Sequence, residues 1–161
     1  MIRLGVVGDI GSGKSYVAKL FGYPVFNADI EVAKLYKKNR KCYHKLKKKL
    51  PTYITSFPVK KSKLFEAVMC NRNNLKKIVK IVHPLVRVRM NNFFEKNKNK
   101  KIVVVDIPLL MENKINKNNY ILVFVDAKQK EINKRLRRRP NINFRVIKKL
   151  KKLQFSVKLK K

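Results

Sequence analysis

The feature that most constrains this chain is a glycine-rich segment near its N-terminus, GDIGSGKS, at residues 8–15. It satisfies the pattern GxxxxGK[ST] and lies between an apolar run at residues 2–7, which predicts a buried strand, and a segment with helical spacing. Glycines let backbone N–H groups curl around a phosphate, and the N-terminus of the following helix adds positive potential. Three of the chain's five glycines fall in this loop. The segment therefore predicts a site for nucleotide phosphates.

The residues of this loop have distinct predicted roles. Lys14 is expected to reach the β- and γ-phosphates of ATP, and the hydroxyl of Ser15 to ligate Mg²⁺. ATP and Mg²⁺ are therefore the expected cofactors. The alternative is a glycine-rich turn with an incidental lysine, but the position between a strand and a helix favours a phosphate loop. The expected ATP contacts in this segment are Gly8, Gly11, Ser12, Gly13, Lys14, Ser15 and Tyr16.

Strands and helices alternate along the chain, which predicts an α/β fold with a mostly parallel sheet. Apolar runs predict strands at residues 2–7, 23–27, 101–106 and 120–126. Helical spacing follows the glycine loop and recurs from residue 29, over 62–69, from 73 or 74, and over 128–138. Pro84 is expected to break or kink the long helix in which it lies. Residues 37–60 are lysine-rich, and no element is predicted there.

Positive charge dominates the composition. The 161 residues include 42 Lys and Arg against nine Asp and Glu, a net charge of +33. Abundant Lys and Asn are also typical of AT-rich coding, so the charge predicts attraction to polyanions in general and no specific nucleic-acid partner. No apolar stretch reaches the roughly 18 residues of a membrane span, and the N-terminus does not resemble a signal peptide. We therefore expect no membrane partner. Cys42 and Cys70 lack a CxxC spacing, so we expect neither a zinc site nor a disulfide. Together these observations predict a cytoplasmic location.

Three aspartates follow predicted strands, and ligands of open α/β sheets lie at the carboxyl ends of strands. Asp106 ends the run KIVVVD and is predicted to hold Mg²⁺ directly or through water. Asp29 could orient an acceptor hydroxyl and take its proton; the alternative is a helix N-cap. Asp126 ends the run YILVFVD and is interpreted as a cap or turn residue.

Cationic groups near residue 135 are candidates for charge neutralisation. Arg135 and Arg139 are four residues apart, a spacing that places both on one helix face. Such a pair could neutralise the charge that develops on a transferring phosphoryl group. The alternative is a solvated basic face. His83 precedes Pro84 in the apolar segment IVHPLV, where a structural histidine is favoured over a catalytic one.

Five segments occur in an order that resembles the dephospho-CoA kinase family, which performs the last step of coenzyme A biosynthesis. They are LGVVGDIGSGKSYVAKLFG, VFNADIEVAKL, IVHPLVR, VVVDIPLLMEN and VDAKQKEINKRLRRR. The resemblance implies a P-loop NTPase fold of three αβα layers, like that of nucleoside monophosphate kinases, with a parallel five-stranded sheet. It implies one domain over residues 1–161, with a core at about 1–36 and 100–135, a CoA-binding helical region at 37–99 and a lid at 136–156.

The resemblance also implies roles for matching residues. Asp29 would act on the ribose 3′-hydroxyl of dephospho-CoA, while Lys14 and Arg135 would complete the catalytic set. Arg139 would close on the nucleotide phosphates, and Ser15 and Asp106 would hold the metal. The expected substrates are ATP and dephospho-CoA, and the expected assembly is a monomer. The residues that match the family's substrate side are Asp29, His83, Pro84, Arg87, Asp106 and Pro108.

The chain also departs from the family pattern. Asn27 replaces the first acid of D-A-D, Asp9 stands where the family usually has glycine, and Pro140 replaces an aspartate. Because the chain ends seven residues after Gln154, the family's last strand and terminal helix are expected to be absent, through truncation or as a natural short form. These departures leave Lys14 and Ser15 in place.

Two other functions compete with this one. A P-loop kinase for another small-molecule or nucleotide acceptor would have the same loop. A GTPase would have an NKxD motif and DxxG after the metal strand, but residues 116–119 read NKNN and residues 106–109 read DIPL. The segments that favour dephospho-CoA are those around Asp29, HPLVR and DIPLLME.

Overall fold

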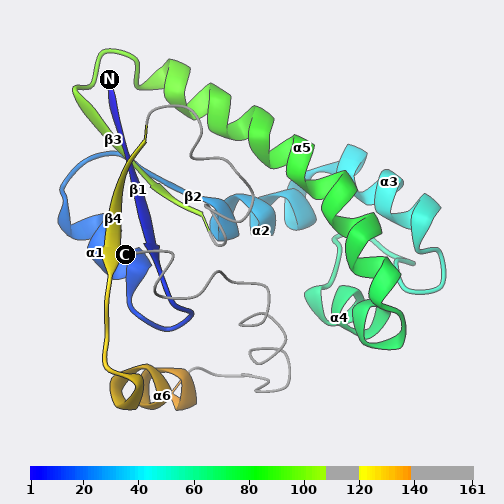
Figure 1. The fold of residues 1–161 in the computed structure, drawn as a ribbon. Helices are drawn as coiled ribbons and strands as arrows, with labels where there is room; N and C mark the ends of the chain where they lie inside the picture. The colour runs from blue at the N-terminus through cyan, green and yellow to red at the C-terminus, as the bar shows by residue number, and fades with distance from the viewer. Residues whose placement is uncertain (108–119, 139–161) are drawn as a thin grey trace. The chain divides into compact units, whose positions relative to one another are not determined.

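The structure is a computed structural model, and it describes residues 1–107 and 120–138 (Figure 1). The chain divides into two compact units: unit 1 combines Met1–Asn27 with the chain from Asn97 onward, and unit 2 is Ala28–Lys96. The first boundary between the units falls after residue 27. No helix in the described ranges is long and apolar enough to cross a membrane.

Unit 1 is built on a parallel sheet (Figure 1). In its described part the strand order is β2-β3-β1-β4, and all neighbouring strands pair in parallel, which confirms the predicted α/β class. Its elements are β1 (Ile2–Gly8), α1 (Lys14–Leu20), β2 (Val25–Asn27), β3 (Ile102–Asp106), β4 (Tyr120–Val125) and α6 (Gln129–Arg137). The predicted strands and helices of this unit are thus all present.

The sheet has an apolar interior because β3 is buried on both of its faces. Val103, Val104 and Val105 are fully buried, which explains why the run is continuously apolar rather than alternating. On one face, Ala18 of α1 packs with Val6 and Val104. Burial of a valine contributes about 1.5–3 kcal/mol, so this contact fixes α1, and with it the phosphate loop, against the sheet.

Unit 2 is helical. Its elements are α2 (Ala28–Lys38), α3 (Arg40–Lys49), α4 (Lys61–Cys70) and α5 (Arg72–Lys96). The long helix α5 packs against each of the other three. Their shared core includes the buried residues Leu35, Leu46, Leu64, Ile78 and Val82.

Two features of unit 2 were not foreseen. Helix α3 lies within the helical region that the family resemblance implied, but the residue pattern did not indicate it, because its apolar stripe consists of little more than Cys42 and Leu46 among lysines. Pro84 is expected to break or kink the long helix, and it does not break it: α5 continues through this residue and is 25 residues long. A proline inside a helix costs about 3 kcal/mol, and the packing of Ile78 and Val82 before it and Met90 after it offsets that cost.

An ion pair joins α2 to α5. Arg89 Nη1 lies 2.8 Å from Glu31 Oε2, and Lys34 Nζ lies 2.6 Å from Glu31 Oε1. The Glu31 side chain is only 18% exposed. Burial by itself raises the pKa of Glu31, but the hydrogen bonds from Lys34 and Arg89 outweigh it and hold the pKa below its ordinary value of 4.5.

This lowered pKa predicts a pH-dependent stability. Because Glu31 binds its proton less tightly when folded, its contribution is complete above pH 4.5 and is lost as the pH falls through the folded-state value. We expect Glu31→Gln to lower the free energy of unfolding by about 1 kcal/mol at pH 7, measured by urea denaturation. The difference from the original chain should be smaller at pH 3 than at pH 7, because the folded state takes up this proton as the pH falls.

The matched control is Glu66→Gln. Glu66 also pairs with a lysine, Lys63 at 2.8 Å, but both side chains are 50% exposed. Exposed pairs contribute about 0–1 kcal/mol, so the control should change little at either pH. A loss in Glu31→Gln that is the same at both pH values would contradict the assigned pairing.

Candidate active site

The phosphate loop has the backbone shape that its glycines predict. Gly11 and Gly13 have φ values of +90° and +105°, which other residues adopt only with strain. The N–H of Ser12 donates to the carbonyl oxygen of Asp9 at 3.1 Å, which closes a turn before α1 begins at Lys14. The loop therefore leads directly into the N-terminus of α1, where backbone N–H groups and the helix dipole favour an anion.

The Lys14 side chain folds back over its own loop. Its Nζ donates to the carbonyl oxygens of Gly8 at 3.1 Å and of Asp9 at 2.7 Å. Carbonyl oxygens are neutral acceptors, and an ammonium group exchanges them readily for the charged oxygens of a phosphate because charge-assisted bonds are stronger. The lysine predicted to bind phosphate thus has its ammonium within the loop.

Helix α6 packs against the phosphate loop. Arg135 Nη1 donates to the carbonyl oxygen of Ser12 at 2.7 Å. A Cβ added at Gly11 would lie 3.0 Å from Leu136 Cγ and 3.1 Å from Ile132 Cγ2. Helix α6 is therefore connected to the loop by a hydrogen bond and by close packing. The sequence analysis gave Arg135 a role toward phosphate, and this bond to the loop backbone was not foreseen.

The loop fits a phosphate on two further grounds. Ser12 Oγ is buried and has no hydrogen-bond partner among the described residues, and such atoms are rare unless a ligand or water completes them. A Cβ added at Gly13 would lie 3.1 Å from Arg135 Nη1, so a side chain there would crowd the space beside the loop. Ser15, the predicted metal ligand, is exposed on α1, and Tyr16 is 70% exposed beside it.

Asp106 lies at the carboxyl-terminal side of the sheet, where the phosphate loop also begins. It is the last residue of β3, which pairs with β1, so the carboxyl ends of both strands face the same edge. The residue is 3% exposed, and Asn27 Nδ2 donates to its Oδ2 at 2.6 Å. Within residues 1–107 and 120–138, no three His, Cys, Asp or Glu side chains form a metal cluster. The buried carboxylate of Asp106 fits Mg²⁺, which is held by one or two carboxylates together with substrate phosphates and water.

The other predicted substrate residues lie in unit 2. Asp29 is exposed and is the second residue of α2, so it lies within the first turn of the helix and not before it. His83, Pro84 and Arg87 lie on α5, and all three are exposed. Partial burial of the His83 ring and the neighbouring Arg87 lower the pKa of His83. Pro108 and Arg139 lie outside the described residues.

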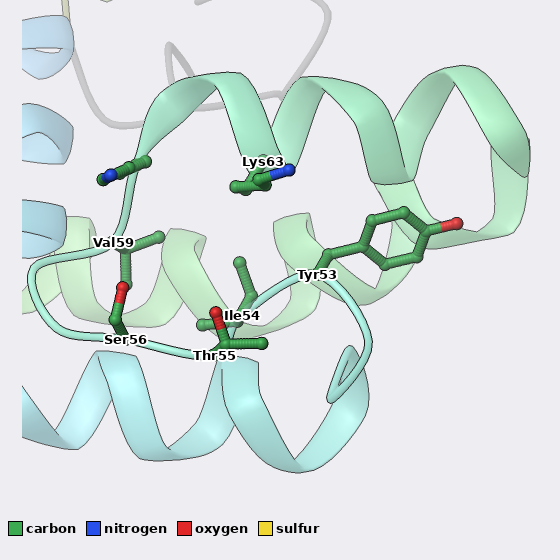
Figure 2. A pocket seen from close by; sticks show the side chains of 7 residues that line it. Tyr53, Ile54, Thr55, Ser56, Val59 and Lys63 are labelled. Carbon is green, nitrogen blue, oxygen red and sulfur yellow. The ribbon is translucent and has the colours of Figure 1, made fainter.

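Unit 2 also holds a small pocket that the sequence did not predict (Figure 2). It has a volume of about 70 Å³ and lies between the segment that joins α3 to α4 and the start of α4. None of the predicted substrate residues that the structure describes contributes to it. Its lining residues are Tyr53, Ile54, Thr55, Ser56, Val59, Lys60 and Lys63.

Asn27 is a site residue that the sequence analysis did not select. It was noted only as a departure from an acidic pattern, although it ends the same predicted strand that precedes Asp29. Strand pairing places it opposite Asp106, a register that residue order alone does not give.

A parallel sheet with a glycine loop and a strand-end aspartate defines a P-loop nucleotide-binding protein. The sequence model of the dephospho-CoA kinase family matches residues 2–161. The chain belongs to this family of transferases, which catalyse the final step of coenzyme A biosynthesis and use ATP.

Individual relatives agree with this assignment. A dephospho-CoA kinase of Bartonella henselae is 36% identical over 77% of this chain and 66% of its own length. One from a Wolbachia species of Brugia malayi is 30% identical over 98% of this chain and 83% of its own length. A crystal structure of a Thermus thermophilus protein superposes with a TM-score of 0.78 at 27% identity, covering 99% of this chain and 83% of that one.

The glycine geometry predicts the effect of a single methyl group. We expect Gly11→Ala to weaken ATP binding by at least about tenfold, because a Cβ there is strained by the positive φ and also meets Ile132 and Leu136. Fluorescence titration with a labelled ATP analogue measures the change.

The control is Gly22→Ala. Gly22 also has a positive φ, +69°, but an added Cβ meets no atom within 4 Å. Both variants should lose stability through strain, by about 1 kcal/mol, whereas ATP affinity should fall only in Gly11→Ala. Equal ATP affinity in the two variants would contradict the proposed coupling between α6 and the loop.

Proposed function

We propose that this chain transfers the γ-phosphoryl group of ATP to the ribose 3′-hydroxyl of dephospho-CoA, which gives CoA and ADP. The observation that carries the proposal is the phosphate loop at the carboxyl end of β1 with the buried Asp106 at the end of the neighbouring strand β3. Family membership supports the choice of acceptor.

In this proposal the residues of unit 1 hold the phosphoryl donor. The loop N–H groups and Lys14 Nζ bind the β- and γ-phosphates, which places the γ-phosphorus for in-line attack and absorbs charge as the transfer proceeds. Ser15 and Asp106 would hold Mg²⁺, which shields the phosphate charges when bound. Arg135 keeps the loop in shape through the Ser12 carbonyl and supplies positive charge from α6. Arg139, which lies outside the described residues, is proposed to bind the nucleotide phosphates.

Asp29 is the proposed acid–base residue. The acceptor hydroxyl oxygen forms a bond to the γ-phosphorus while the bond to the β–γ bridging oxygen breaks, and ADP leaves with that electron pair. The hydroxyl proton passes to the Asp29 carboxylate. Asp29 suits this role because it is exposed and comes two residues after Asn27, the last residue of β2. His83, Pro84 and Arg87 on α5 are the proposed contacts for the rest of the acceptor, with Pro108.

We infer a cytoplasmic, monomeric enzyme. Both cysteines of the chain are free, Cys42 buried and Cys70 exposed, and burial raises the pKa of the Cys42 thiol, which keeps it protonated and unreactive. Free thiols of this kind are typical of a reducing compartment.

An ADP-release assay tests the choice of acceptor. With ATP and Mg²⁺ present, we expect release to require dephospho-CoA and to stay at background with AMP, adenosine or no acceptor. Release that is equally fast with AMP would contradict the proposal and favour a kinase for another nucleotide acceptor.

Substitution of Asp29 separates chemistry from donor binding. We expect Asp29→Ala to lower kcat by at least about a hundredfold, because general-base catalysis contributes about 10²–10⁴, and to leave ATP affinity within about twofold. Lys14→Ala should lose both turnover and ATP affinity. Asp126→Ala, which removes an exposed carboxylate at the end of β4, is the control and should retain activity. Loss of ATP binding in Asp29→Ala would contradict its role.

A further inference from the structure

The ends of β2 and β3 are joined by a short hydrogen bond. The two strands are parallel, and the register places Asn27 opposite Asp106 as the last pair. Asn27 Nδ2 donates to Asp106 Oδ2 at 2.6 Å. A carboxylate that is 3% exposed has little water around it, so this amide supplies much of the polar environment of Oδ2. The bond also fixes the rotation of the carboxyl group, and therefore the direction in which Oδ1 points.

The chemistry of residue 27 sets the charge at this position. An amide neutralises no charge and adds none, so the pair of strand ends carries the single negative charge of Asp106. A carboxylate at residue 27 would place two negative charges at hydrogen-bonding distance, and their mutual repulsion would be relieved by a divalent cation between them. With asparagine, a cation gains only one carboxylate from this pair and must obtain its remaining ligands from phosphate oxygens, water and other groups.

We infer that Asn27 is a positioning residue for Asp106 that makes divalent-cation binding depend on bound nucleotide. The inference rests on the proposed function, because it takes Asp106 as a metal ligand beside ATP. Asn27 orients the carboxylate toward a phosphate-bound cation and, by being uncharged, keeps the nucleotide-free site weak for free cations. The chain would then bind its metal as the metal–ATP complex and not before ATP.

Two substitutions separate orientation from charge. Mn²⁺ is the probe, followed by electron paramagnetic resonance of the free ion, with and without ATP. Asn27→Ala should weaken Mn²⁺ binding to the ATP-loaded chain by about tenfold, as loss of a partner that orients a metal ligand does. Its affinity for ATP in EDTA should stay within about twofold. Asn27→Asp should instead strengthen Mn²⁺ binding to the nucleotide-free chain by about tenfold or more.

The controls separate positioning from damage to the fold. Asn73→Ala removes the side chain of an exposed asparagine on α5. It should change the Mn²⁺ affinity neither of the ATP-loaded chain nor of the nucleotide-free chain. Asn27→Ser, which can still donate a hydrogen bond, should recover part of the affinity that Asn27→Ala loses. Thermal unfolding of each variant identifies any that is misfolded, and the Asn27→Ser and Asn27→Asp comparisons then decide the question.

Several results would overturn the inference. They are Mn²⁺ affinity of ATP-loaded Asn27→Ala within twofold of the original, no gain of nucleotide-free binding in Asn27→Asp, and tight Mn²⁺ binding by the original chain without ATP. These readouts need no acceptor. Failure of the proposed function would therefore appear separately, as Mn²⁺–ATP binding that responds to residue 27 in a chain that does not phosphorylate dephospho-CoA.

Discussion

The donor site depends on how the backbone of residues 8–14 is held. The loop begins where β1 ends, and two positive-φ glycines turn it into α1. Ala18 fixes that helix to the sheet, while Arg135 holds the Ser12 carbonyl from α6. Packing on both sides means that the N–H groups are arranged before any phosphate arrives, so binding does not have to order them. Preorganised dipoles of this kind are also the main source of transition-state stabilisation in phosphoryl transfer.

Scarcity of negative charge is the second constraint. With nine acidic residues against 42 basic ones, most of the surface attracts anionic substrates. Each carboxylate in the site is therefore a negative charge in a mainly positive field. The structure places Asp106 in a buried position with an uncharged partner, and Asp29 in an exposed position at the start of α2. The first environment suits a fixed metal ligand, and the second suits a group that exchanges a proton with a substrate.

Local signals in the sequence predicted much of this arrangement. These signals are the glycine loop, the apolar run of β3 and its terminal aspartate. Each depends on residues that are neighbours in the sequence, so the sequence alone is enough to recognise it. The residue pattern did not indicate helix α3, because its two buried residues stand among many lysines. It also did not indicate that α5 continues through Pro84, because packing with three other helices offsets the cost of the proline. The bonds of Asn27 to Asp106 and of Arg135 to Ser12 join residues 79 and 123 positions apart. Only the strand register and the docking of α6 bring them together.

The most direct test of the central claim follows the phosphoryl group itself. The chain is incubated with γ-³²P-labelled ATP, Mg²⁺ and dephospho-CoA, and the products are separated and treated with a phosphatase specific for 3′-phosphates. The account predicts label in CoA that the phosphatase releases, and labelling of CoA that is at least about a hundredfold slower with Asp29→Ala. Label that appears only as inorganic phosphate, or in an acceptor position that the phosphatase leaves intact, would contradict it.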